Sequence, residues 1–365
     1  MSAMLKFGIG LMLPVERPWT PGKEAQAYAD GLELVETADR LGFDQVWMVE
    51  HHFLEEYSHC SAPELFLAAV AQRTERIRLG RGIAVCLREY NHPAMLAERS
   101  AVLDILSGGR LELGTGRAAT WTELGGFGVD PNTTKASWDE FVRELPKIWM
   151  QERYGYEGQF FSMPERAVLP KPVQKPHPPL WVAVSSEGTE RDAADRGLGW
   201  QGLSQGGVAE MEMRVKEYHR RIQSCEPVGG FVNEQINFSN FLYCHEDQKV
   251  AVQRGRDLVE RFLSSASRQV AAKDVVPSHS YRTSAALAKM REMAEQQLSK
   301  TSSANPFENI SIGTPDHIEG VLRRWEGIGV NRINFSVTSS GFDDLDVIKK
   351  SMEMFAKEVL PRFKS

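Results

Sequence analysis

The stretch at residues 46–53 reads VWMVEHHF, and it joins the end of an apolar segment to three ionisable side chains. The apolar residues VWMV are followed directly by Glu50, His51 and His52. A short apolar run of this kind is typical of a strand in a parallel sheet whose two faces are both covered. Side chains that follow the carboxyl ends of parallel strands gather at one edge of the sheet. The stretch therefore predicts a buried strand that ends at a functional site.

Similar apolar segments recur along the chain and alternate with stretches of helical spacing. Between residues 23 and 41, apolar residues repeat at helical intervals, and Gly42 follows where a helix would end. The segments that we expect to form strands are 6–13, 44–50, 77–85, 110–116, 179–186, 200–204, 236–244 and 332–338. Eight parallel strands joined by helical crossovers favour a (β/α)8 TIM barrel, of the α/β class, over an open doubly wound sheet.

The predicted barrel uses the whole chain, residues 1–365, as a single domain with insertions. Residues 118–175 contain a helix at 135–149 and an extended GQFF piece, and residues 264–309 are long, polar and rich in helical sequence. Connections of this length usually carry a lid or an accessory helix pair. For 264–309 both interpretations stay open: a lid over the barrel mouth, or a structural helix pair that includes 285–298.

The composition is that of a soluble enzyme, with 42% hydrophobic and 25% charged residues. A net charge of −6 gives no reason to expect a nucleic acid or an anionic membrane as partner. No segment approaches the roughly 18 consecutive apolar residues of a membrane helix, and the N-terminal segment lacks the basic flank of a signal peptide. The four cysteines show no metal-type spacing, so we expect reduced thiols and a cytoplasmic protein.

Three interpretations of Glu50, His51 and His52 are open from the residues alone: a metal site, a proton-transfer site or an incidental polar turn. The segment lacks a compact metal motif such as HExxH. Adjacent side chains on a strand point to opposite faces, so at most one histidine should face the barrel mouth. That histidine could transfer a proton near neutral pH, whereas the other would form a local hydrogen bond or lie on the surface.

Two further segments place anion-binding groups at strand ends. Ser185, Ser186 and Thr189 flank a glycine turn that leads from a strand into a helix. Hydroxyl and backbone N–H groups in such a turn can bind phosphate, although simple N-capping would need only one of them. Arg117 follows the fourth strand in LGTGRA, where it could pair with a phosphate or with a neighbouring carboxylate. The residues alone thus indicate a barrel enzyme with a phosphorylated ligand.

Together these segments resemble the luciferase-like flavin-dependent monooxygenases, in particular the bacterial luciferase group. The resemblance rests on EHHF at 50–53, NHP at 91–93 with LDILSGGRLELGTGRA at 103–118, VAVSSEGTERDAADRGL at 182–198 and GTPDHIEGVLRRWEGIGVNRINF at 313–335. It spans nearly the whole chain apart from 264–309, and EHHF combined with the SGGRLELG block is specific.

The resemblance implies a barrel that binds reduced FMN, delivered by a separate flavin reductase. Dioxygen would add to the flavin to give a C4a-peroxy species, which oxygenates a small organic substrate of apolar character. His51 matches the catalytic histidine at the flavin edge, with Glu50 tuning or orienting it. Arg117, Ser186 and Thr189 match phosphate-binding positions. We expect a homodimer, with a small-molecule substrate, dioxygen and the reductase as its partners.

Two other positions of the resemblance concern the flavin ring. Ala84 matches a strand residue whose backbone lies against the isoalloxazine, and we expect a non-prolyl cis peptide before it. Gly116 stands where luciferases have a reactive cysteine, so the resemblance favours a general monooxygenase over a light-emitting one. The residues expected to line the substrate site are Trp47, Tyr57, Tyr90, Trp121 and residues of 264–309, although core packing is the favoured role for Trp47, which lies in mid-strand.

Two other functions are compatible with the same pattern. A deazaflavin-dependent hydride-transfer oxidoreductase would need a wider basic groove for the acidic tail of its cofactor, and the sequence offers only Arg88, Arg117 and Lys135 for it. A non-catalytic flavin-binding protein would be expected to be shorter and to lack a complete barrel.

Overall fold

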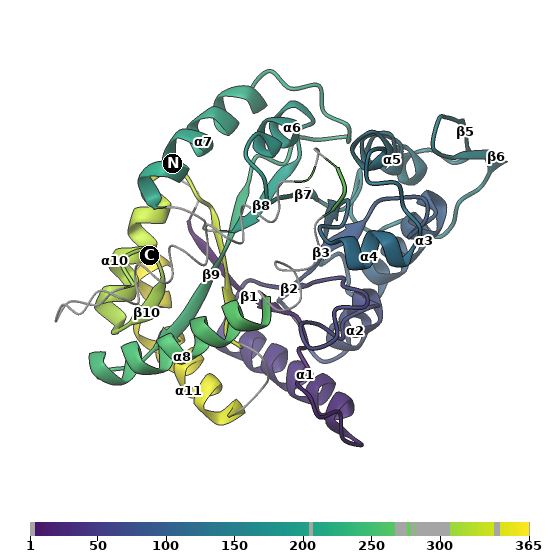
Figure 1. The fold of residues 1–365 in the computed structure, drawn as a ribbon. Coiled ribbons are helices and arrows are strands. Elements are labelled where there is room, and N and C mark those ends of the chain that lie inside the picture. Colours follow the sequence, from purple (N-terminus) through teal and green to yellow (C-terminus); the bar gives the residue numbers. More distant parts are fainter. Residues whose placement is uncertain are drawn as a thin grey trace.

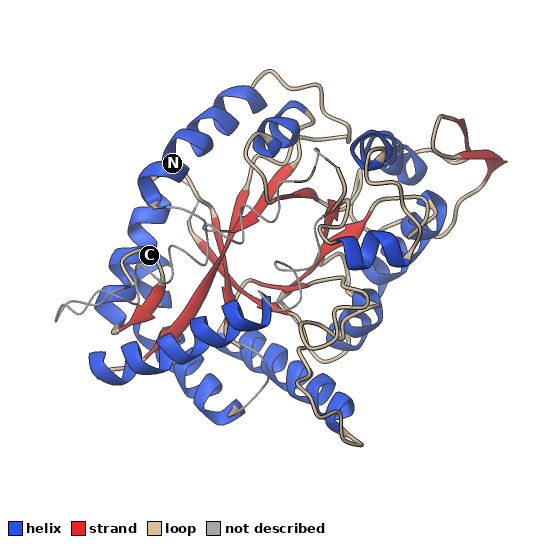
Figure 2. Cartoon of the chain, viewed as in Figure 1, coloured by secondary structure: helices blue, strands red, loops and turns tan. Residues whose placement is uncertain are grey.

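The computed structural model describes residues 4–203, 207–266, 276–278, 281, 307–338 and 344–364. Within these residues, eight parallel strands close into a barrel that is surrounded by helices (Figures 1 and 2). Around the ring, the strands are β1 (Lys6–Leu11), β2 (Gln45–Met48), β3 (Arg78–Val85), β4 (Leu111–Gly116), β7 (Leu180–Val184), β8 (Gly199–Leu203), β9 (Ile236–Cys244) and β11 (Arg332–Ser336). The ring closes because β8 pairs with β9 and β11 pairs with β1. The predicted single-domain (β/α)8 barrel is confirmed.

Helices follow the strands as the apolar spacing predicts. They are α1 (Lys23–Leu41), α2 (Pro63–Ala71), α3 (Pro93–Leu106), α4 (Trp121–Gly126), α5 (Thr134–Met150), α6 (Thr189–Asp195), α7 (Val208–Ile222), α8 (Gln248–Ala266), α10 (Pro315–Gly327) and α11 (Leu345–Glu358), with a final 3-10 turn, η2 (Leu360–Phe363). Helix α1 ends as expected at Gly42, which adopts a left-handed φ of 86° and returns its N–H to the last turn. The short helix α4 lies in a segment where no helix was expected.

A buried ionic layer closes the amino end of the barrel. Glu112 accepts hydrogen bonds from Arg78 (2.5 Å), Arg332 (3.0 Å) and the indole Nε1 of Trp181 (2.7 Å). Burial alone would raise the pKa of Glu112, but Arg332 and Arg78 hold it below its ordinary value. Because this layer fills the amino end, open space in the barrel lies toward the carboxyl ends of the strands.

The two long connections differ in how much of them is described. In the first, β5 (Tyr154–Glu157) and β6 (Ser162–Arg166) form an antiparallel hairpin that projects away from the barrel (Figure 1), and GQFF is its turn. In the second, residues 264–266 complete α8, and most of 264–309, including the expected helix at 285–298, lies outside the described residues. A separate strand, β10 (Ser311–Gly313), pairs with β9.

None of the helices in the described ranges has the length and apolar character that crossing a membrane would need.

Candidate functional site

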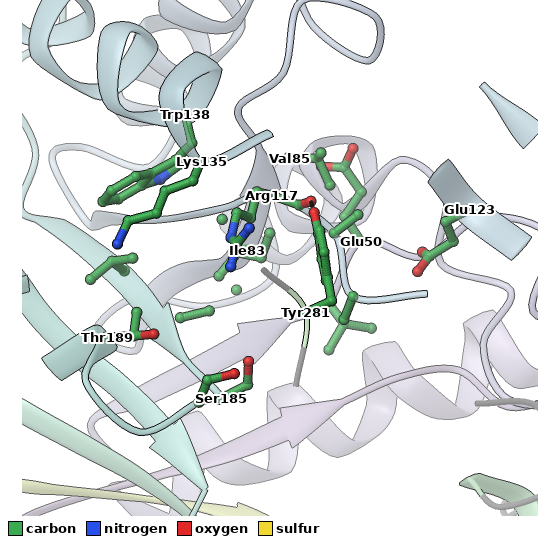
Figure 3. A pocket seen from close by; sticks show the side chains of 18 of the residues that line it. Glu50, Ile83, Val85, Arg117, Glu123, Lys135, Trp138, Ser185, Thr189 and Tyr281 are labelled. Carbon is green, nitrogen blue, oxygen red and sulfur yellow. Dashed lines mark hydrogen bonds between the residues drawn. The ribbon is translucent and has the colours of Figure 1, made fainter. Parts of the chain in front are cut away.

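A cavity of about 190 Å³ opens at the carboxyl ends of β2, β3, β4 and β7 (Figure 3). Six of the seven predicted catalytic and cofactor-binding residues line it: Glu50, His51, Arg117, Ser185, Ser186 and Thr189. Residues more than 130 positions apart in the chain therefore meet in one place, because the barrel brings the ends of neighbouring strands together. Ala84 does not line the cavity.

One end of this cavity is basic. The Arg117 guanidinium lies over the ring of Tyr281, 4.5 Å from its centroid, and donates to the Thr134 hydroxyl at 3.2 Å. Figure 3 shows Arg117 between Lys135 and Tyr281. Lys135 also lines the cavity and pairs with Asp192 at 2.9 Å. Two cations beside three hydroxyl side chains give this end the donors that a phosphate group requires.

The turn before α6 satisfies part of its own hydrogen-bonding capacity. Gly188 has a left-handed φ of 92°, and its N–H donates to both oxygens of the Glu190 carboxylate at 3.1 and 2.9 Å. Glu190 in turn pairs with Arg214 at 2.6 Å. The expected cradle of free backbone N–H groups is therefore reduced, and an anion here would be bound chiefly by the hydroxyls of the turn and by the Arg117 and Lys135 side chains.

At the other end of the cavity, His51 is held by a buried carboxylate. Its Nδ1 lies 3.0 Å from Oε1 of Glu123, which also accepts the His52 backbone N–H at 3.1 Å. The Thr120 hydroxyl donates to the second oxygen at 2.7 Å. Burial alone would raise the pKa of Glu123, but His51, Thr120 and the His52 amide together lower it. An ionised carboxylate only accepts, so Nδ1 carries a proton and Nε2 is the nitrogen left for chemistry.

Glu50 has a different partner from the one expected. It pairs with Arg81 at 2.5 Å and with His52 at 3.4 Å, and Glu64 lies 3.5 Å from the same arginine. Strand β2 ends at Met48, so the chain leaves strand geometry before Glu50, and its side chain turns toward β3. The residue that orients His51 is Glu123, which the motif analysis missed. Its signal was the capping-box sequence TWTE at 120–123.

His52 lies in an aromatic cluster outside the cavity. Its ring centroid is 5.0 Å from that of Phe127, 5.8 Å from Tyr90 and 6.1 Å from Phe53. The two adjacent histidines thus have separate surroundings. In the part of the chain that the structure describes, no group of three or more His, Cys, Asp or Glu side chains is arranged to hold a metal ion.

The end of β3 forms one wall of the cavity. The non-prolyl cis peptide joins Gly82 to Ile83, one residue earlier than expected. Gly82, Ile83 and Val85 line the cavity, whereas Ala84 is fully buried behind them. The Ile83 side chain also explains why residue 116 is a glycine, because a Cβ on residue 116 would lie 2.6 Å from Ile83 Cδ1.

A second cavity of about 230 Å³ lies beside the first and occupies the centre of the barrel mouth. Both cavities are lined by His51, Gly82 and Ile83, so the imidazole stands where they meet. Of the aromatic residues expected at a substrate site, Trp47 and Tyr57 line this cavity. Burial, with the nearby Glu123 carboxylate, raises the pKa of Tyr57 to about 12, so its phenol stays protonated.

Comparison with known proteins gives relatives that match over very different lengths. The uncharacterized protein y4wF of Sinorhizobium fredii is 40% identical over 173 residues, which cover 47% of this chain and 50% of that protein. The chain thus spans about half the length of that relative. The oxygenase component of the flavin-dependent trigonelline monooxygenase of Acinetobacter baylyi is 26% identical over 371 residues, 97% of this chain and 94% of that protein.

Two further matches cover nearly the full length. An F420-dependent glucose-6-phosphate dehydrogenase of Segniliparus rotundus is 25% identical over 376 residues, 97% of this chain and 100% of that protein. The crystal structure of monooxygenase RslO1 from Streptomyces bottropensis superposes with a TM-score of 0.78 at 28% identity, covering 98% of this chain and 100% of that one. The family model described as luciferase-like monooxygenase matches residues 7–332. With the barrel and its cavity, this match establishes that the chain belongs to the luciferase-like monooxygenase family.

Proposed function

We propose that this protein is the oxygenating component of a two-component monooxygenase that uses reduced FMN and dioxygen on a small organic substrate. The observation that carries the proposal is one cavity with phosphate-type donors at one end and the His51–Glu123 pair at the other. The full-length match to an oxygenase component of a flavin-dependent enzyme supports the same assignment.

The side chains of this cavity fit FMN. Arg117, Lys135 and the hydroxyls of the turn before α6 would hold its phosphate, and apolar groups from Val49, Ile83 and Val182 would face its ring. When bound, reduced FMN supplies the electrons that activate dioxygen. The apolar walls exclude water from the reacting atoms.

His51 would handle the proton in this scheme. Glu123 keeps Nδ1 protonated and fixes the ring, so Nε2 can accept a proton in neutral imidazole and donate one in imidazolium. The ring is only partly exposed and lines both cavities, which places Nε2 within reach of groups bound in either.

The test of this function is anaerobic titration with reduced FMN, followed by oxygen-consumption measurements. We expect reduced FMN to bind, and the bound flavin to be reoxidised by air with a delay relative to free flavin. Failure of reduced FMN to bind the full-length chain would refute the proposal.

A second candidate is hydride transfer with F420, favoured by the full-length match to an F420-dependent dehydrogenase. The same titration with reduced F420 discriminates the two. Among the described residues, the cations that line this cavity are Arg117 and Lys135, and a single phosphate would use both, so the basic end offers little additional charge for a long acidic tail. We therefore expect FMN to bind more tightly than F420, and the opposite order would favour the dehydrogenase.

Replacing Arg117 with alanine should weaken the binding of reduced FMN. Loss of a charge-assisted hydrogen bond costs about 1.5–3 kcal/mol, which is about one to two decades in the dissociation constant. Anaerobic flavin titration measures this. The matched control is Arg143→Ala, which removes an arginine that pairs with Asp139 on α5 and does not line the cavity. Equal flavin affinity of Arg117→Ala and the parent would reject this phosphate site.

Replacing Glu123 with glutamine should slow oxygenation without weakening flavin binding. The amide keeps the shape but loses the charge that fixes the His51 tautomer. Carboxylates that orient metal-bound histidines contribute about 10–100-fold, and we expect a loss of that order here. The expected result is a lower kcat with an unchanged flavin dissociation constant and KM. Glu123→Asp should restore part of kcat, whereas a purely structural role would lower thermal stability and leave kcat per folded molecule unaltered.

We also propose that the chain forms a homodimer through α2 and α3. The outer face of these helices carries exposed apolar side chains: Leu65, Met95, Val102, Ile105 and Leu106. An apolar stripe along two adjacent helices is typical of an interface between copies related by a twofold axis.

Replacing Ile105 with lysine should convert this dimer to a monomer, because each twofold interface would then bury two unpaired charges. Light scattering after size exclusion should give a mass near 41.0 kDa for the variant and twice that for the parent. The control is Met213→Lys on α7. Met213 is as exposed as Leu65 of the proposed interface, but it lies outside the α2–α3 face. A monomeric parent would contradict the assignment.

A further inference from the structure

A carboxylate stands among the cations at the basic end of the first cavity. Asp192, from the first turn of α6, lines this end together with Arg117 and Lys135. Its Oδ2 lies 2.9 Å from the Lys135 ammonium. Among the described residues at this end, two positive charges are therefore accompanied by one negative charge. A site that only had to attract a phosphate would gain nothing from that carboxylate.

The Asp192–Lys135 pair lies on the solvent side of the basic end. The Lys135 side chain is 58% exposed and the Asp192 side chain is 26% exposed. The pair joins the first turns of α5 and α6 beside the cavity. Figure 3 shows Lys135 and Thr189 on the opposite side of Arg117 from Glu123. A ligand with its ring toward Glu123 and its phosphate at Arg117 would therefore meet the ion pair just beyond the phosphate.

Contacts outside the cavity hold Asp192 in this place. Arg196, one turn further along α6, donates to the Asp192 backbone carbonyl at 2.9 Å and lies 3.5 Å from its carboxylate. Arg196 is itself paired with Asp139 of α5 at 2.6 Å and does not line the cavity. Because the carboxylate is held at the cavity, an arriving anion has to share Lys135 with it.

We propose that Asp192 is a specificity-determining residue, which restricts the cofactor to a flavin that ends in a single phosphate. A phosphate monoester carries a charge of about −1.5 to −2 at neutral pH, so it already exceeds the one positive charge in excess at this end. A second phosphate, as in a flavin dinucleotide, would add negative charge beside the carboxylate. No further cation lines the cavity among the described residues to compensate for it.

The proposal rests on the proposed function, which assigns this cavity to a flavin with its phosphate at the basic end. Attraction by Arg117 and Lys135 explains why a phosphate would bind, but it does not explain why the ligand would end there. A like charge placed against the wrong ligand is a common means of discrimination. Because the pair is partly exposed, solvent screens some of the repulsion, and we expect Asp192 to contribute about tenfold.

The test compares three reduced flavins under anaerobic conditions: riboflavin, FMN and FAD, which carry no phosphate, one phosphate and two. Dissociation constants are measured for the parent and for Asp192→Asn, which keeps the shape of the side chain and removes its charge. The parent should prefer FMN to FAD, and in the variant this preference should fall by about tenfold or more. FMN should bind the variant at least as tightly as the parent, and riboflavin should bind both equally.

The matched control is Asp195→Asn, which removes the same charge from the same helix. Asp195 pairs with Arg221 at 2.6 Å and does not line the cavity, so its variant should keep the parental preference. Thermal unfolding confirms that each variant is folded. Asp192→Ala also removes the charge and should give the same change in preference as Asp192→Asn.

An unchanged preference in the Asp192 variants, an equal change in Asp195→Asn, or FAD binding to neither parent nor variant would overturn the proposal. So would weaker FMN binding in Asp192→Asn, because Asp192 would then serve to position Lys135 for the phosphate. Failure of the proposed function has a different signature, since the parent itself would bind no reduced FMN.

Discussion

Replacing His51 with alanine should lower the rate of coupled oxygenation by about 10²–10⁴, the usual contribution of a general acid–base group. Flavin binding should be nearly unchanged, because the phosphate-type donors lie at the other end of the cavity. The physical reason is the geometry of the ring: Glu123 holds Nδ1, and Nε2 is left at the junction of the two cavities. Product formation per oxygen consumed measures coupled oxygenation, and an anaerobic flavin titration measures the affinity for flavin.

His52 provides the matched control for this variant. It is adjacent in sequence, yet its ring packs against Phe127 and Tyr90 outside the cavity and does not line it. Its links to the site are its backbone N–H, which donates to Glu123, and a 3.4 Å contact with Glu50. His52→Ala should keep most of the oxygenation rate while lowering thermal stability. Near-parental coupling in His51→Ala, or a larger loss in His52→Ala, would show that the proton passes through another group.

Replacing Arg81 with methionine should destabilise the protein by about 3–5 kcal/mol, because it leaves the Glu50 carboxylate buried without its counter-ion. Both side chains are almost fully buried, at 3% and 4% exposure. Urea unfolding of the parent and the variant measures the difference. The control is Arg73→Met, since Arg73 pairs with Glu36 at the surface, with both side chains exposed, and such pairs contribute about 0–1 kcal/mol.

The Arg81–Glu50 pair also predicts how the free energy of unfolding depends on pH. Burial tends to raise the pKa of Glu50, but Arg81 and His52 lower it below its ordinary value of 4.5. In the parent, the ionised Glu50 carboxylate stabilises the folded state at pH values above its ordinary pKa. This stabilisation is lost as the pH falls through the lowered pKa of the folded protein. Without Arg81, burial dominates and the carboxyl protonates more readily. The difference in unfolding free energy between parent and Arg81→Met should therefore narrow on acidification, and a constant difference would contradict this account.

The fold could be predicted because its signals are local. Each barrel strand is a short apolar run, the long helices show their own spacing, and markers such as Gly42 show where helices end. Strand ends in a parallel barrel converge without further information. This explains why the sequence alone predicts Glu50, His51, Arg117 and the turn residues at one site.

What the sequence could not reveal depends on contacts between distant segments. Glu123 reaches His51 from 72 residues away, on a helix too short to show periodicity. Glu50 turns to Arg81 because β2 stops two residues earlier, and strand alternation could not foresee that stop. Ala84 is buried behind the cavity wall because the β3–β4 register shifts between Arg81 and Ala84.

The close fit of Ile83 against Gly116 has an evolutionary consequence. Any larger residue at 116, including the cysteine of luciferases, would collide with Ile83 unless that side chain moved or shrank. The two positions are thus coupled: a larger residue at 116 requires the Ile83 side chain to rotate away or to be replaced by a smaller one. Relatives with a bulkier residue at the position of Gly116 should carry a smaller one at the position of Ile83. A lineage that passes from one arrangement to the other must open space on β3, before or together with the change at 116.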